Sequence, residues 1–96
     1  MEQLTIQAGN IYLDSDQYDK YFSAVQAVVL LKQEVGVLLM PVQHASGGLL
    51  LKIRNAAGDR IVHASEFFTS NNIECESKQV IEAYWNSDMA ALMLNI

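Results

Sequence analysis

The residue types that most often carry chemistry are sparse in this chain, which holds two histidines and one cysteine. His63 lies three residues before Glu66, and an imidazole with a carboxylate can bind a metal or transfer protons. That spacing places both side chains on one face of a helix but on opposite faces of a strand. Because the segment has the pattern of a strand, we interpret His63 as a sheet histidine. A three-ligand metal site requires His44 and His63 to converge with Glu66 or Cys75.

The second histidine, His44, is followed two residues later by Ser46 in a glycine-containing turn. Serine and histidine suggest a nucleophile with its base, but neighbours on a tight turn rarely align the hydrogen bond that activation requires. Cys75 lies between Glu74 and Glu76, whose carboxylates are expected to raise its pKa and make it a poor nucleophile. The sequence therefore contains no recognisable set of nucleophile, base and orienting group, and it favours a non-enzymatic protein.

Basic residues gather in one region of the chain. Three of the six, Lys52, Arg54 and Arg60, surround one predicted hairpin. Such a cluster is a candidate patch for a phosphate or an acidic partner. The simpler interpretation, which we favour, is a solvated hairpin end whose charge is balanced by Asp59.

Aromatic residues form a second candidate for ligand binding. Two groups of them occur in stretches that we predict to be helical, and together they suit a pocket between helix and sheet. Aromatic stripes of this kind belong to the core more often than to a pocket. The residues are Tyr18, Tyr21, Phe22, Tyr84 and Trp85.

The composition is that of one globular domain, with 96 residues, 51% of them hydrophobic and 18% charged. The net charge of −5 argues against binding to nucleic acid or to anionic lipid, because both attract basic surfaces. A single cysteine excludes an internal disulfide. We expect no signal peptide and no membrane span, hence a cytoplasmic protein, and the sequence indicates no particular cofactor.

The N-terminal third is predicted to form a strand or small hairpin near residues 3–13, followed by a helix. Ser15 has the character of a helix start, and apolar residues at spacings of three and four then predict a helix over residues 16–34, which Gly36 would end. An alternative makes residues 27–31 a buried strand, because β-branched and apolar residues run together there. We favour the helix.

The rest of the chain is predicted to be a sheet and a second helix. The sheet is a three-stranded antiparallel meander with strands near residues 37–42, 49–54 and 60–66. In its second hairpin, pairing of Arg54 with Asp59 is preferred, because pairing of Arg54 with Arg60 opposes two cations. Apolar spacing predicts the second helix over residues 77–94. The predicted fold class is therefore α+β, with an antiparallel meander packed with two helices.

Two helices on one face of such a sheet would leave Val37, Leu39 and Leu50 exposed, as a patch too large for a monomer. A homodimer built through the sheet or its edge is the simplest way to cover the patch. We therefore interpret the protein as a small interaction module that binds itself or a protein partner. The alternative is a domain that binds a small ligand or a metal through His44, His63 and the aromatic residues.

Overall fold

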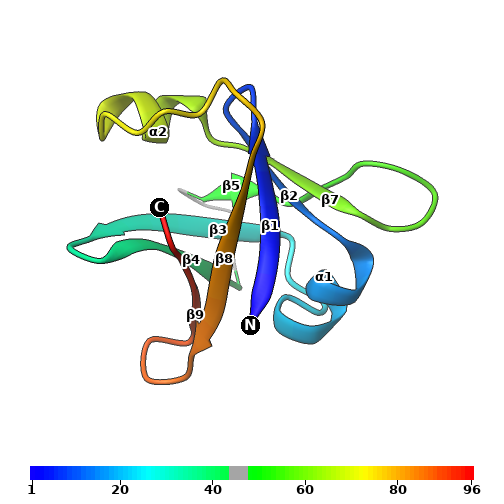
Figure 1. Cartoon of the computed structure of the whole chain (residues 1–96). Coiled ribbons are helices and arrows are strands. Elements are labelled where there is room, and N and C mark those ends of the chain that lie inside the picture. Colours follow the sequence, from blue (N-terminus) through cyan, green and yellow to red (C-terminus); the bar gives the residue numbers. More distant parts are fainter. Residues whose placement is uncertain (44–47) are drawn as a thin grey trace.

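In the computed structural model, which describes residues 1–43 and 48–96, nine strands form one antiparallel sheet that curls into a near-barrel (Figure 1). Two short helices lie against it, so the predicted α+β class with an antiparallel sheet is confirmed. The elements are β1 (Glu2–Gln7), β2 (Asn10–Leu13), α1 (Ser15–Tyr21), β3 (Ala27–Gln33), β4 (Gly36–Val42), β5 (Leu49–Leu50), β6 (Lys52–Ile53), β7 (Arg60–His63), α2 (Ser65–Ser70), β8 (Gln79–Asn86) and β9 (Ala91–Leu94). Within the described ranges, no helix is long and apolar enough to cross a membrane.

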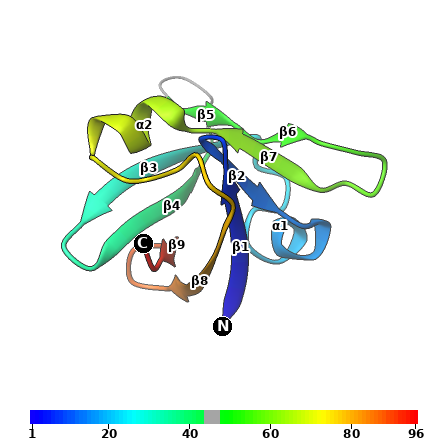
Figure 2. The same cartoon turned by 45° about the horizontal axis from the view of Figure 1, so that its top comes forward.

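Residues 49–53, which we call the bridging segment, connect the two ends of the sheet. The strand order is β5-β3-β4-β9-β8-β1-β2-β7-β6, so β5 and β6 are the outermost strands. In the chain they are separated only by Leu51, whose amide donates to the carbonyl oxygen of Gln26 at 2.9 Å. β5 pairs with β3 and β6 pairs with β7. One short run of chain therefore brings the two outermost strands of the sheet, β5 and β6, together (Figure 2).

The curled sheet encloses the hydrophobic core. Alternate side chains of a strand point to the same face, and those that face inwards have lost nearly all contact with solvent. Fully buried examples are Leu4, Ile6, Ile11, Leu13, Val37, Leu39, Leu92 and Leu94. Burial of this kind stabilises the fold by about 25 cal/mol for each Å² of apolar surface removed from water. The core therefore lies inside one sheet and not between a flat sheet and covering helices.

The predicted helix over residues 16–34 is correct only in its first two turns. α1 ends at Tyr21, and residues 27–33 form β3, in agreement with the alternative that kept residues 27–31 as a strand. Ala24 has a φ of 64°, so the chain turns through a left-handed conformation without a glycine to mark it. The β-branched residues that follow then pair with β4 along their whole length.

The predicted helix over residues 77–94 is wrong, because this region forms the hairpin of β8 and β9. Ile81 and Ala83 face the core from β8 at the period of two that a strand requires. Apolar residues also fall at helical spacings there, which is why the pattern favoured a helix. The turn contains Ala90 with a φ of 51° and has no glycine or proline to indicate a break.

The predicted meander is wrong in its first pairing and right in its second. β3 lies between β4 and the bridging segment, so residues 37–42 do not pair with residues 49–54. The hairpin of β6 and β7 has the preferred register, with the amide of Arg54 donating to the carbonyl oxygen of Asp59 at 2.7 Å. β7 ends at His63, and the predicted strand of residues 60–66 gives way to α2.

Of the two alternatives expected near residues 3–13, a strand or a small hairpin, the structure has the hairpin, and its turn packs against the start of α2. Ala8 and Gly9 both have positive φ, at 52° and 76°, as in the tight turns that suit the twist of a hairpin. The amide of Gly9 donates to the carbonyl oxygen of Cys75 at 2.8 Å, and its own carbonyl accepts from Ala64 at 2.9 Å. A Cβ atom at Gly9 would lie 2.5 Å from the Cβ of Ser65, so only glycine fits.

Replacing Gly9 with alanine is expected to lower the free energy of unfolding by about 2–5 kcal/mol, because left-handed strain and a clash with Ser65 add together. Gly58→Ala is the matched control. Its φ is +90°, but the nearest atoms lie 3.6 Å from the added Cβ, so only strain of about 1–2 kcal/mol applies. Urea denaturation measures both values. Equal losses for the two variants would contradict the close packing at Gly9.

Candidate functional site

The structure brings His63 and Glu66 to one cleft of about 410 Å³ between β3, the end of β7 and the start of α2. Nδ1 of the exposed His63 ring lies 2.7 Å from Oδ1 of Asn10. The two atoms form one hydrogen bond, which fixes the orientation of the imidazole. The lining residues are Val28, Val29, Leu30, Leu49, His63, Ala64, Ser65, Glu66 and Phe67.

This cleft does not have the arrangement of a metal centre or a catalytic triad. The hydrogen-bond partner of His63 is Asn10, and neither Ser65 nor Glu66 takes that place. In residues 1–43 and 48–96, no three His, Cys, Asp or Glu side chains are placed to hold one metal ion. His44 and Ser46 lie outside the described residues, so the convergence of the two histidines stays a prediction.

The single cysteine lies in an environment that raises its pKa, as its sequence neighbours led us to expect. Burial raises the pKa of the Cys75 thiol, and the carboxylates of Glu76 and Glu74 raise it further. The predicted direction is therefore confirmed, although loss of water is the larger cause. A thiol with a raised pKa is a poor nucleophile at neutral pH.

The aromatic residues predicted to line a pocket are divided between two surfaces. Tyr21 stacks on Trp85, with ring centroids 5.3 Å apart and planes 15° apart. Phe22 is fully buried beside them and belongs to the core. Tyr84, the neighbour of Trp85 on β8, is 47% exposed and points to the opposite face of the strand. The set therefore does not form one pocket.

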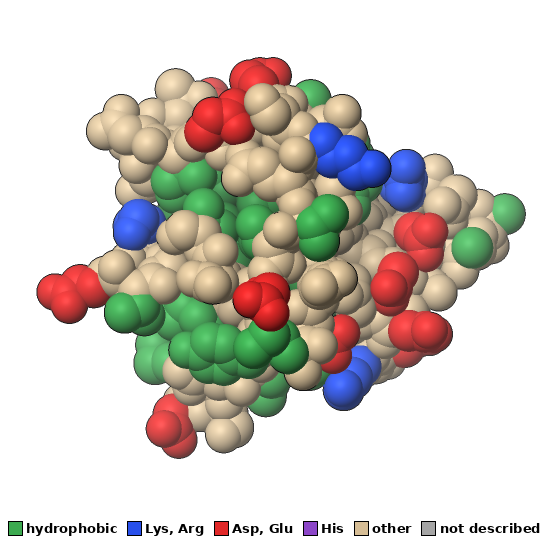
Figure 3. Space-filling view, viewed as in Figure 1, with side chains coloured by type: hydrophobic (Ala, Val, Ile, Leu, Met, Phe, Trp, Pro, Cys, Tyr) green, Lys and Arg blue, Asp and Glu red, His purple; other side chains and the backbone are tan. Residues whose placement is uncertain are grey.

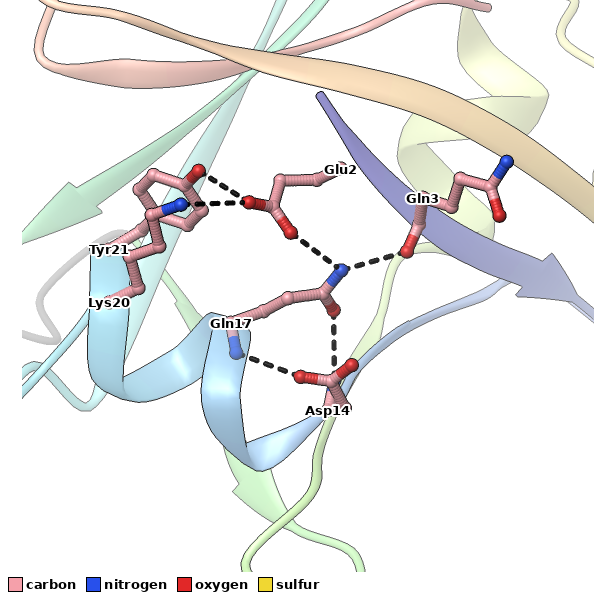
Figure 4. Close-up of polar contacts among 6 residues, drawn as sticks. All are labelled: Glu2, Gln3, Asp14, Gln17, Lys20 and Tyr21. Atoms are coloured by element: carbon pink, nitrogen blue, oxygen red, sulfur yellow. Dashed lines mark hydrogen bonds and ion pairs between the residues drawn. The ribbon is translucent and has the colours of Figure 1, made fainter.

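A polar network fastens α1 to β1 (Figure 4). The side chain of Asp14 accepts a hydrogen bond from the amide of Gln17 at 2.8 Å, and the side chain of Gln17 accepts from the amide of Asp14 at 3.0 Å. This reciprocal pair starts α1 one residue earlier than the predicted cap at Ser15. Gln17 is 6% exposed, and its Nε2 donates to the carbonyl oxygen of Gln3 at 2.8 Å.

Glu2 completes the network from β1. Its carboxylate accepts from the Tyr21 hydroxyl at 2.6 Å and from Lys20 Nζ at 3.3 Å. The Tyr21 hydrogen bond is the main reason that the pKa of the Glu2 carboxyl is held below its usual value. No buried side-chain nitrogen or oxygen in the described residues lacks a partner. The network is therefore a structural anchor whose buried polar atoms are all paired.

The three cations predicted as one patch are separated by the pleat of the hairpin. Arg54 lies over the ring of Tyr12, 4.8 Å from its centroid, in a polar cleft that Asp59 also lines. Arg60 lies over the ring of Tyr18 at 3.8 Å and lines a different cleft together with Lys52. Side chains of Arg54 and Arg60 point to opposite faces, because Arg60 pairs with the residue before Arg54. By the same alternation Lys52, which pairs with Ile61, shares a face with Arg54, so the three cations do not form one patch.

The residues predicted to mediate self-association are mostly inaccessible. Val37 and Leu39 are 0% exposed, because the curled sheet covers them from within one chain. Leu50 is 50% exposed, as predicted. The premise that two helices must cover the sheet is therefore wrong, although the oligomeric state itself stays a prediction.

Apolar side chains that the sequence did not single out form a row on the outside of the sheet. The strand register places Leu31, Leu38, Met93 and Tyr84 side by side across β3, β4, β9 and β8, and we call this row with its surroundings the outer face. Leu31 and Tyr84 are 39% and 47% exposed, whereas Leu38 and Met93 between them are buried. In Figure 3, hydrophobic side chains gather over β4, β9 and the adjoining part of β8. The feature of the sequence that could have predicted this row is the second set of alternating apolar residues in these strands.

No protein-family model, no curated protein and no solved structure matches this chain. The surfaces that can carry function are therefore distinguished by their chemistry alone. Of the eight large apolar side chains that are exposed in the described residues, four lie on or beside the outer face. These four are Met1, Leu31, Val35 and Tyr84. The outer face is the strongest candidate for an interaction surface.

Replacing Glu2 with glutamine is expected to lower the free energy of unfolding by about 1 kcal/mol at pH 7, because the charge-assisted bonds from Tyr21 and Lys20 are weakened. A carboxyl whose pKa is lowered by folding stabilises the protein above its unfolded pKa, and this contribution is lost as the pH falls through the folded value. The difference between wild type and variant should therefore shrink as the pH falls below the unfolded pKa of about 4.3, and it should vanish only below the lowered folded pKa. Urea denaturation from pH 7 to pH 3 measures it, and a constant difference would contradict the assignment.

Proposed function

We propose that the protein is a small non-enzymatic interaction module that forms a homodimer through the outer face. The observation that supports this proposal is the apolar row across four strands, in which Leu31 and Tyr84 at the two ends are exposed, while Leu38 and Met93 between them are buried. Next to the row, the exposed side chains of Met1, Val35 and Tyr84 line one groove, and exposed apolar side chains that adjoin one another mark interaction sites. In Figure 1, α1 and α2 lie away from β4 and β9.

The chemistry of the outer face suits a second copy of the same chain. The row itself carries no charged side chain, so it needs no partner of opposite charge. Beside it, Met1, Val35, Tyr84 and Met93 line a groove of about 290 Å³, with Glu82 at its border. An apolar centre with a polar border is the usual anatomy of a protein–protein interface. A two-fold axis would bring the row of one copy against the row of the other. Two-fold symmetry is the commonest way to close an oligomer.

A second candidate function is small-ligand binding in the cleft that contains His63. It is supported by the apolar walls from β3 and by Asn10, which holds the imidazole in one orientation. Glu66 supplies a carboxylate at the same cleft. A thermal-shift screen with metabolites and metals discriminates the two functions, because a specific ligand raises the melting temperature by binding the folded state.

We also propose a cytoplasmic location. It is supported by the use of cysteine, since the chain has a single, buried thiol and no partner for a disulfide within itself.

The dimer is expected to have twice the mass of the 10.7 kDa chain in size-exclusion chromatography with light scattering at micromolar concentration. Leu31→Glu should raise its dissociation constant by roughly two to three orders of magnitude, because it buries an unpaired carboxylate in the interface. Ile53→Glu is the matched control, since Ile53 is also apolar and exposed, at 70%, but lies on β6 away from the outer face.

Circular dichroism establishes that both variants are folded before their masses are compared. A wild-type protein that stays at the mass of one chain would overturn the proposal. Equal dissociation by the two glutamate variants would show that the outer face is not the interface.

A further inference from the structure

One side of β3 has a partner strand for only two of its residues. Towards β4, the strand is paired along its whole length, from Ala27 to Gln33. On its other side, within residues 1–43 and 48–96, β3 pairs only with β5, through Ala27 and Val28. We call residues 29–33 the β3 edge, because this part of the strand has one paired side and one side that no described strand covers.

The strand register identifies which backbone groups point outwards from the β3 edge. Along an antiparallel strand, the residues alternate between those that bond to one neighbouring strand and those that bond to the other. The amide of Leu51 donates to the carbonyl oxygen of Gln26, just before β3, so even-numbered residues here direct their N–H and C=O groups away from β4. The N–H and C=O groups of Leu30 and Lys32 therefore point outwards.

Two further contacts agree with this alternation. Pro41 of β4, which has no N–H to donate, is paired with the even-numbered Val28, where no bond between the two strands is required. At the far end of the β3 edge, the carbonyl oxygen of Lys32 accepts from the side-chain amide of its neighbour Gln33 at 3.3 Å. A backbone carbonyl takes such a local donor where it bonds to no neighbouring strand, and an added strand can displace it.

The β3 edge forms one wall of the cleft that contains His63. Val28, Val29 and Leu30 all line this cleft, although consecutive side chains of a strand point to opposite faces. Three consecutive residues share one cleft when it runs along the edge of their strand. The opposite wall is the start of α2, which lies on this side of β3 in both Figure 1 and Figure 2.

An extended chain satisfies the chemistry of this cleft. Its own N–H and C=O groups can pair with those of Leu30 and Lys32, as in the addition of a peptide strand to the edge of a sheet. The occupant has to be a single strand with no neighbour of its own. A strand from the sheet of a second copy would bring its neighbouring strand about 4.8 Å further out, where the wall formed by α2 stands.

The charge of the cleft indicates the side chains of the occupant. In the described lining the one carboxylate is that of Glu66, which is exposed. The ion pair found in the described residues joins Lys20 to Glu2, so Glu66 is not neutralised within that part of the chain. On a chain with a net charge of −5, such a carboxylate favours a basic side chain, while the apolar wall favours aliphatic ones.

We propose that the cleft takes up an extended segment of a partner protein, which adds a strand to the β3 edge. The segment carries a basic residue between two apolar ones. Because side chains alternate along a strand, the apolar pair faces the apolar wall and the basic residue reaches Glu66 on the solvent side. The proposal concerns the edge of the sheet and not the outer face, so it stands independently of dimer formation, and it names a protein segment in place of a small ligand.

The probe is the peptide acetyl-Thr-Val-Arg-Val-Thr-amide, titrated into ¹⁵N-labelled protein. Saturable shifts are expected for the amides of residues 29–33 and 63–67. The peptide should also slow the hydrogen exchange of the Leu30 and Lys32 amides, because each gains a partner. The amides of the odd-numbered residues between them already bond to β4, so their exchange should change less.

Peptides methylated on backbone nitrogen test whether a strand is formed. One carries the methyl group at its arginine, and the other carries methyl groups at both valines. Since alternate amides of a strand face the same neighbour, only one of these two peptides keeps the amides that bond to β3. That peptide should bind like the parent, and the other should bind about tenfold more weakly, because carbonyl oxygens of β3 lose their donors.

A proline variant tests the same pairing from the side of the protein. Lys32→Pro removes an outward N–H of the β3 edge, and it should fold, because proline is tolerated where the N–H faces away from the neighbouring strand. Lys32→Ala is the matched control, since it removes the same charge but keeps the amide. Only the proline variant should lose affinity, by about tenfold. The ¹⁵N spectrum reports whether each variant is folded.

The role of Glu66 is tested with a second pair of variants. Glu66→Gln should weaken binding of the arginine peptide roughly threefold, the range for one exposed ion pair. It should not affect a peptide that has glutamine in place of arginine. Asp88→Asn is the control for net charge, because Asp88 is exposed in the turn between β8 and β9 and does not line the cleft.

Four results would overturn the proposal. Equal affinities of the two methylated peptides would show that no strand is added to β3. Shifts centred on Tyr84 and Met93 would show that the peptide uses the outer face instead. An equal loss of affinity in Glu66→Gln and Asp88→Asn would show that only overall charge matters. A lack of saturable shifts at millimolar peptide would show that the cleft takes up no extended segment.

Discussion

Closure of the sheet by residues 49–53 is the constraint on which the rest of the structure depends. Two residues of the segment pair with β3, two pair with β7, and one lies between them, so the segment joins the two ends of the sheet. Without this closure, the inward side chains of β4 and β9 would face solvent. With it, a chain of 96 residues buries a continuous core inside one sheet, and its helices are left with a local role. α1 is fastened across one end by the network of Glu2 and Gln17, and α2 is held by the turn at Gly9.

The same closure determines what remains outside. Strands have two faces, so apolar runs such as that of β4 place one set of side chains in the core and the other on the outer side of the sheet, where Leu38 packs in a second, smaller buried cluster. Val37 and Leu39 are inside, while Leu38 lies in the outer row with Met93 and Tyr84. The bridging segment also changes partner halfway, which leaves open space beside β6. The outer row and the open space beside β6 thus follow from one topological feature.

Local chemistry in the sequence predicted the hairpins whose pairing depends on neighbouring residues. Opposite charges fixed the register at Arg54 and Asp59, and the glycine of the first turn marked the N-terminal hairpin. The first turn of α1 was recognisable from its capping residues, within one position. Burial of Cys75 was not predicted, but the direction of its pKa shift was.

Long-range pairing and unmarked turns escaped prediction for physical reasons. The turns at Ala24 and Ala90 use left-handed alanines, so no glycine indicated that the presumed helices end. Tertiary pairing then overrode helical spacing in β3, β8 and β9. The position of β3 between β4 and the bridging segment depends on contacts that are distant in sequence. Because the sequence does not reveal these contacts, Val37 and Leu39 were expected to be exposed, and they are buried instead. The apolar outer row became visible only once the register was known.

The most direct test is to observe both pairings of the bridging segment in one molecule by nuclear Overhauser effects between backbone protons. The structure requires contacts of Leu50 with Ala27 and, two residues later, of Lys52 with Ile61. Both sets should appear together in the folded protein. Contacts of residues 49–53 with β4, as in a simple meander, or loss of either set, would contradict closure of the sheet.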